Sequence, residues 1–77
     1  MARTTLELYL LDCLVLLKET ALEARTKSKE VNSDYQMGRV MAYCEALSLL
    51  QQQADAFGIP LATVGLGDFD PEQDLLF

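Results

Sequence analysis

Residues 4–30 read TTLELYLLDCLVLLKETALEARTKSKE, and this stretch, which lacks glycine and proline, decides the fold. It opens with the pattern of a capping box, in which the Thr4 hydroxyl accepts from the Glu7 amide and the Glu7 carboxylate reaches back. Apolar residues then recur every three or four positions, which predicts a helix over about residues 5–30. They form two rows: Leu6, Leu10, Cys13, Leu17 and Ala24, and then Leu8, Leu11, Val15 and Leu22.

A second helix follows after a short break. Ser33, with Gln36 three residues later, forms another capping-box pattern and predicts a helix over about residues 34–57. Gly58 suits the left-handed position past a helix end, and Pro60 cannot continue the helix. The main apolar stripe of this helix comprises Val40, Tyr43, Leu47, Leu50, Ala54 and Phe57.

The remaining residues differ in composition from the two helices. We divide the chain into a helical hairpin, residues 1–58, and an extended or irregular acidic segment, residues 59–77. This segment lacks helical and strand periodicity. Asp70 and Pro71 could start one short helical turn, because aspartate caps helices well and proline favours the first helical position. The segment carries four acids and no base: Asp68, Asp70, Glu72 and Asp74.

Two long helices joined by about three residues must lie antiparallel. The fold class we predict is therefore all-α. The first helix carries apolar residues on at least two sides, and one neighbouring helix shields only one of them. We expect two hairpins to pair as a homodimer and form a four-helix bundle with two-fold symmetry. The alternative is that residues 59–77 fold back and cover the second side.

Composition narrows the function classes. The chain has 77 residues, a net charge of −6 and no histidine, which argues against a nucleic-acid partner because phosphate binding needs a basic patch. No uncharged run approaches the roughly 20 residues of a membrane span, since Glu7 and Asp12 interrupt the first apolar stretch. The same two acids, and the lack of a small-residue cleavage site, argue against a signal peptide. We expect a soluble cytoplasmic protein.

The sequence predicts no catalytic, cofactor-binding or metal-binding residue, because each candidate has a simpler structural explanation. The acidic run Asp68–Asp74 resembles a calcium loop in spacing but lacks its glycine and its final glutamate. Cys13 and Cys44 fall at different levels of the hairpin and are expected to be buried free thiols. The other candidates are a carboxylate-bound metal at Glu19, Glu23, Glu45 and Asp55, and an anion or ligand site at Arg39, Tyr35 and Tyr43.

The stretch from Gly38 to Ile59, which begins GRVMAYCEAL, resembles segments of small bacterial helical proteins, and this resemblance implies no function. We expect a non-enzymatic, self-associating protein–protein interaction module that could also bind a second protein. Two alternatives stay open. One is a bundle that binds a small molecule or an ion, and the other is an acidic regulator of a basic protein.

Overall fold

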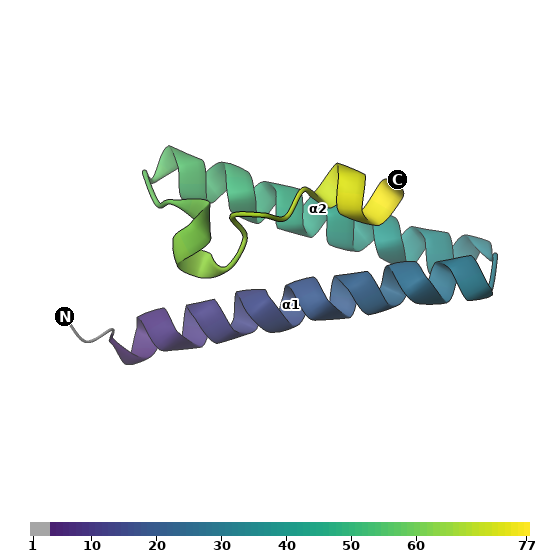
Figure 1. Ribbon diagram of the computed structural model, residues 1–77, viewed down its shortest axis with the longest axis horizontal. Helices are drawn as coiled ribbons and strands as arrows, with labels where there is room; N and C mark the ends of the chain where they lie inside the picture. The colour runs from purple at the N-terminus through teal and green to yellow at the C-terminus, as the bar shows by residue number, and fades with distance from the viewer. Residues whose placement is uncertain (1–3) are drawn as a thin grey trace.

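The computed structural model describes residues 4–77 and is built on two long helices that run antiparallel (Figure 1). Helix α1 spans Thr5–Glu30 and helix α2 spans Asp34–Ala56. No strand occurs in this part of the chain. The prediction of an all-α fold with two long helices packed against each other is confirmed.

Local signals in the sequence set the start of each helix. The Thr4 hydroxyl accepts a hydrogen bond of 3.1 Å from the Glu7 amide, and the Ser33 hydroxyl accepts one of 3.2 Å from the Gln36 amide. Each bond satisfies an amide that lacks a partner in the first helical turn. At the other end of α2, Gly58 has a φ of +70°, the left-handed conformation that glycine adopts without strain.

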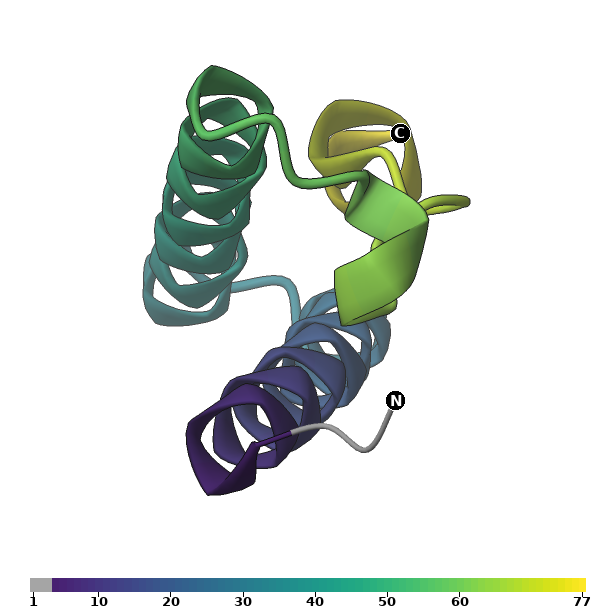
Figure 2. The ribbon, with the colours of Figure 1, turned by 90° about the vertical axis from the view of Figure 1, so that its left-hand side faces the viewer.

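The segment after α2 folds back onto one side of the hairpin, as in the alternative that the sequence left open. It forms a 3-10 turn, η1 (Leu61–Val64), and a π-helical turn, η2 (Glu72–Leu76). An end-on view places α1, α2 and this segment at the three corners of a triangle (Figure 2). Local hydrogen bonds curl the backbone at the start of this segment: the Leu66 amide, for example, donates to the Leu61 carbonyl at 2.9 Å.

The core lies where these three parts meet. Ala21 and Ala24 are the fully buried residues of α1, and their small side chains leave room for larger ones from the facing elements. The buried apolar residues from α2 are Val40, Cys44 and Leu47, and those from the C-terminal segment are Leu66, Phe69 and Leu75. The C-terminal segment is therefore part of the core, which explains how so short a chain completes one.

The two long helices diverge away from their connecting turn (Figure 1), and η1 lies to one side of the gap, against α1 (Figure 2). The backbone at Gly65 approaches α1 so closely that a Cβ atom there would lie 3.0 Å from Val15 Cγ2. We call the end of the molecule where the helices are apart the open end, and the other end the turn end. The wide spacing leaves apolar side chains of both helices without helical neighbours at the open end.

Candidate interaction surface

The C-terminal segment covers one side of α1 and is held there by polar contacts as well as apolar packing. The Lys18 ammonium lies 3.8 Å from the Asp68 carboxylate and 3.4 Å from the Gly65 carbonyl oxygen. Further along, the Arg25 guanidinium donates a 2.9 Å hydrogen bond to the Phe77 carbonyl oxygen. This segment shields Leu11 and Val15, which lie next to Gly65, whereas Leu8 and Leu22 of the same row are exposed.

In the N-terminal half of α1, the side away from Val15 is uncovered, whereas Ala24, further along on that side, is buried in the core. Cys13 precedes Val15 by two residues, which places it about 200° around the helix from the covered side. Leu6, Tyr9 and Leu10 follow the three- and four-residue spacing that aligns them with Cys13. Their exposed fractions are 66% for Leu6, 63% for Tyr9 and 47% for Leu10, which are high for large apolar side chains.

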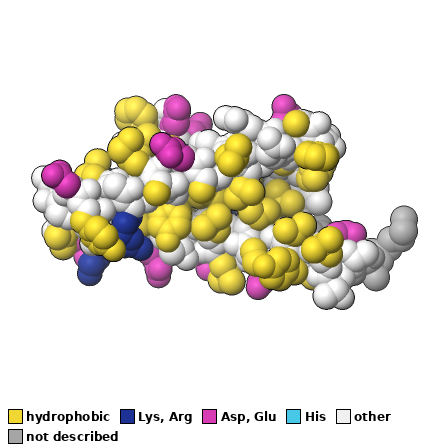
Figure 3. Space-filling model, turned by 180° about the vertical axis from the view of Figure 1, so that it is seen from behind, with side chains coloured by type: hydrophobic (Ala, Val, Ile, Leu, Met, Phe, Trp, Pro, Cys, Tyr) yellow, Lys and Arg dark blue, Asp and Glu magenta, His cyan; other side chains and the backbone are white. Residues whose placement is uncertain are grey.

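Helix α2 extends this uncovered surface. Leu50 is 37% exposed and Phe57 is 77% exposed, and their spacing of seven positions is close to two helical turns. Seen from the side opposite the C-terminal segment, apolar side chains form a band along both helices (Figure 3). We call this band the open face and define it by the following residues: Leu6, Tyr9, Leu10, Cys13, Leu50 and Phe57.

A groove between the helices deepens the open face at the open end. Its floor comes from the C-terminal segment, at Ile59, Val64 and Leu66. Its volume is about 190 Å³, below the roughly 300 Å³ at which small-molecule pockets begin. Gln53 is the only polar residue that lines it, so the groove accepts apolar side chains and offers little to orient a polar ligand. The walls are Leu10 and Leu14 of α1 with Leu50, Ala54 and Phe57 of α2.

Charge is distributed unevenly around the open face. Between residues 4 and 17 and between residues 40 and 57, every charged side chain is acidic. On this side of the described chain, Asp and Glu lie mainly along the edges of the apolar band, and Lys and Arg gather at the turn end (Figure 3). The charged side chains of the open end are therefore all acidic in residues 4–17 and 40–57. These acids are Glu7, Asp12, Glu45 and Asp55.

The acidic run of the C-terminal segment is used for local structure. Asp70 Oδ1 accepts hydrogen bonds from the Glu72 and Gln73 amides at 3.0 and 3.3 Å, which caps the start of η2. Asp74 Oδ2 accepts from the Asp70 amide at 2.9 Å. Among residues 4–77, no three side chains of the metal-binding types lie close enough to hold a metal ion.

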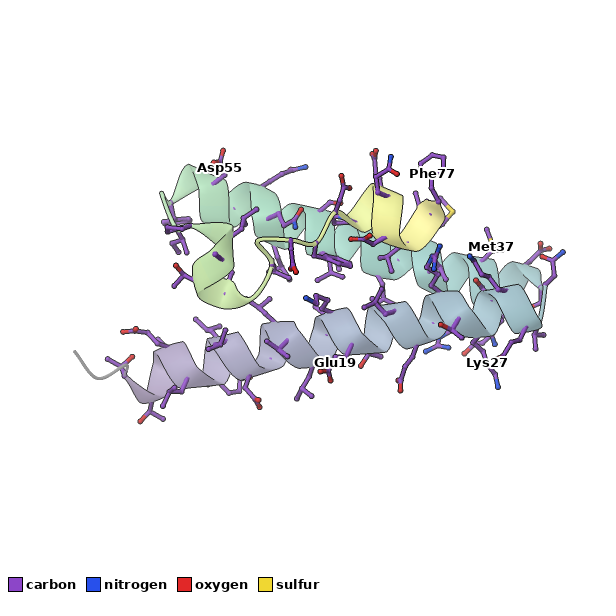
Figure 4. The ribbon with its side chains drawn as sticks, viewed as in Figure 1. Glu19, Lys27, Met37, Asp55 and Phe77 are labelled. Carbon is purple, nitrogen blue, oxygen red and sulfur yellow. The ribbon has the colours of Figure 1, made fainter. Side chains whose placement is uncertain are left out.

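The carboxylates considered for a metal-bridged bundle are not brought together. Glu19 points away from the lower side of α1 and Asp55 away from the upper side of α2 (Figure 4). Glu23 and Glu45 are exposed as well. These side chains lie on the solvated surfaces of the hairpin, away from the contact between the two helices.

Arg39, Tyr35 and Tyr43 do not form a binding site as a group. Arg39 donates a 3.4 Å hydrogen bond to Gln36 Oε1, one turn earlier on the same helix. Tyr43 packs against the core, whereas Tyr35 is among the most exposed residues. The three side chains thus have separate environments.

The two cysteines also have different environments. Both are free thiols; Cys44 is buried as expected, but Cys13 is exposed, so the expectation of burial was wrong for Cys13. Cys13 lies one turn from Tyr9, and hydrogen bonding to Cys13 raises the pKa of the Tyr9 phenol above its ordinary value of 10.0. One sequence pattern indicated the open face. The apolar stripe of residues 34–57 continues to Phe57, and the structure shows that the helices have diverged there, so the last residues of the stripe are exposed.

The chain shows no significant match to any protein-family model, curated protein or solved structure. Within residues 4–77, neither helix contains a stretch long and apolar enough to cross a bilayer. The open face is therefore the feature from which a function can be inferred.

Proposed function

We propose that this protein is a non-enzymatic interaction module that self-associates through its open face. The observation that carries the proposal is that one side of the hairpin is covered by residues 61–77 while the other side leaves large apolar side chains exposed. Contiguous apolar surfaces of this kind mark interfaces in soluble proteins. A second copy is the simplest partner, because its own open face brings a matching apolar surface.

The dimensions of the hairpin allow such a pairing. The molecule measures 46 × 21 × 17 Å, so the whole side that carries the open face projects about 970 Å², and a stable interface buries roughly 800 Å² on each partner. Two hairpins placed face to face bring four long helices together, with both C-terminal segments on the outside. The product is the dimeric four-helix bundle that the sequence predicts.

Light scattering over a dilution series tests the proposal directly. At micromolar concentration we expect a mass near twice 8.6 kDa, and a chain that stays monomeric at every concentration would contradict it. Phe57→Ser should lower the fraction of dimer, because it removes the most exposed side chain of the open face.

Met41→Ser is the matched control. Met41 is also an exposed apolar residue of α2. It lies sixteen positions before Phe57, which places it about 160° around the helix from Phe57. We expect Met41→Ser to leave the mass unchanged. Circular dichroism of each variant shows whether the helices are intact, so that a loss of dimer can be distinguished from unfolding.

A further inference from the structure

The groove at the open end has the volume for one aromatic ring. It measures about 190 Å³, and an apolar cavity of roughly 150 Å³ is enough to bind benzene. Its lining is apolar apart from Gln53, so a ring that enters the groove leaves water for apolar surroundings. A single phenyl side chain therefore matches the groove in both size and chemistry.

Phe57 supplies a phenyl ring on the same face. It is 77% exposed, the highest value among the large apolar side chains of residues 4–77. It contributes to one wall of the groove but does not fill it, because a ring inserted into its own groove would be largely buried. The open face thus carries an unburied ring next to an unfilled groove of matching size.

The other exposed aromatic side chains suit the groove less well. Tyr9 carries a phenol hydroxyl that hydrogen bonds to Cys13, and a buried hydroxyl needs a polar partner. Tyr35 is the second residue of α2, and Phe77 lies toward the turn end (Figure 4), so both are remote from the groove.

We infer that the two copies of the dimer exchange their Phe57 side chains, so that the ring of each copy enters the groove of the other. This inference rests on the proposed function, because it needs a second copy on the open face. Two-fold symmetry makes the exchange reciprocal, since every contact from one copy to the other is repeated in the opposite direction. Each groove is then completed by a residue of the second copy. Aromatic side chains buried in pockets are the anchors that contribute most to binding in many interfaces.

The exchange also sets the alignment of the two copies. Phe57 and the groove both lie at the open end, so the open ends of the two copies meet. An alignment that places the open end of one copy against the turn end of the other leaves both rings without a groove.

The acids of α2 do not oppose this alignment. Asp55 and Glu45 precede Phe57 by two and twelve positions, which places them about 160° and about 120° around the helix from the ring. Their carboxylates therefore lie on other sides of α2, away from the inserted ring.

Two variants that disable the exchange in different ways test it by complementation. Phe57→Ser removes the ring and keeps the other walls of the groove, whereas Ala54→Phe keeps Phe57 and fills the groove with a second ring. Each variant alone should dimerise at least roughly tenfold more weakly than the unmodified chain. In an equal mixture, Phe57 of the Ala54→Phe chain enters the groove of the Phe57→Ser chain. Light scattering should then show dimer at a concentration where neither variant dimerises alone.

The double variant A54F/F57S is the matched control. It lacks the Phe57 ring, so mixing it with Phe57→Ser should restore no dimer. Circular dichroism shows whether each variant keeps its helices, and Ala54→Leu, which adds less volume, replaces Ala54→Phe if that variant unfolds.

The outcomes separate this inference from the proposed function. Dimer in the mixture of Phe57→Ser and Ala54→Phe, without dimer in the control mixture, supports the exchange. An unmodified chain that dimerises while the folded variants fail to complement each other overturns the inference and leaves self-association supported. Variants that dimerise as strongly as the unmodified chain overturn it in the same way. An unmodified chain that is monomeric at every concentration contradicts both.

Discussion

Arg25 of α1 donates a 2.9 Å hydrogen bond to the carbonyl oxygen of Phe77, a residue 52 positions later in the chain. Together with the contacts of Lys18 to Gly65 and Asp68, this bond fastens the C-terminal segment at two levels of the same helix. The side of α1 that carries these bases is thereby occupied. The exposed apolar side is left as the surface available to a partner.

The C-terminal segment should owe its attachment mainly to apolar burial. Leu75 is 3% exposed, so Leu75→Ala should lower the free energy of unfolding by about 2–5 kcal/mol. Arg25→Ala removes an exposed hydrogen bond and should cost about 0.5–1.5 kcal/mol. Urea denaturation measures both, with Leu76→Ala, at a 41% exposed neighbour, as the control. A larger loss from Arg25→Ala than from Leu75→Ala would show that polar contacts dominate.

Leu47 should be the most sensitive position of α2. Its side chain is fully buried where both helices and the C-terminal segment meet, and Leu47→Ala leaves a cavity there. We expect a loss of about 2–5 kcal/mol, measured by thermal or urea unfolding. Leu49→Ala, at a 57% exposed site two residues later, should cost less than about 1 kcal/mol. Equal losses at the two positions would mean that the buried face of α2 is wrongly assigned.

Substitution by alanine should raise the stability of the fold at one glycine and lower it at another. A Cβ at Gly38 meets nothing within 4 Å, so Gly38→Ala should stabilise α2 by about 0.5–1 kcal/mol. Gly65 has a φ of +77° and its Cβ would lie 3.0 Å from Val15, so Gly65→Ala should lower stability by more than about 1 kcal/mol. The urea denaturation midpoint of each variant, compared with that of the unmodified chain, measures the change in stability. Stabilisation by Gly65→Ala would be inconsistent with the close packing of η1 on α1.

Tyr9 should titrate at higher pH than an ordinary tyrosine. Hydrogen bonding to Cys13, and then the charge of the thiolate, raises the pKa of the Tyr9 phenol because both favour its neutral form. The resulting stabilisation is present below the unfolded-state pKa of about 10 and is lost as the pH rises through the folded-state pKa. Ultraviolet absorbance of the phenolate against pH measures the midpoint. Cys13→Ala should shift the titration midpoint of one tyrosine to lower pH. An unchanged titration curve would argue against the contact between Tyr9 and Cys13.

The helix starts were readable from the sequence because they depend on neighbouring residues. The hydroxyls of Thr4 and Ser33 satisfy amides three positions away, and such bonds form wherever the pattern occurs. The short turn begun by Asp70 could be predicted for the same reason. Spacing alone also indicated apolar residues on two sides of the first helix.

Burial in the C-terminal segment could not be read in this way. Phe69 lies between two aspartates in a run that looks fully solvated, yet it is 7% exposed and its carbonyl accepts a 2.7 Å hydrogen bond from Gln51. Its position depends on how the chain reverses at Gly58 and Gly65, and on which side of the hairpin it returns. The same choice decided that Leu11 faces the segment while Cys13 is left exposed.

The sequence by itself determined that this protein is a pair of long helices with more apolar surface than one hairpin can bury. Capping and periodicity are properties of adjacent residues, so no knowledge of the fold was needed to find them. Only the tertiary structure decided which residues of each apolar row are covered and which are exposed. That outcome depends on long-range contacts between the C-terminal segment and α1, for which the spacing of residues along the chain carries no information.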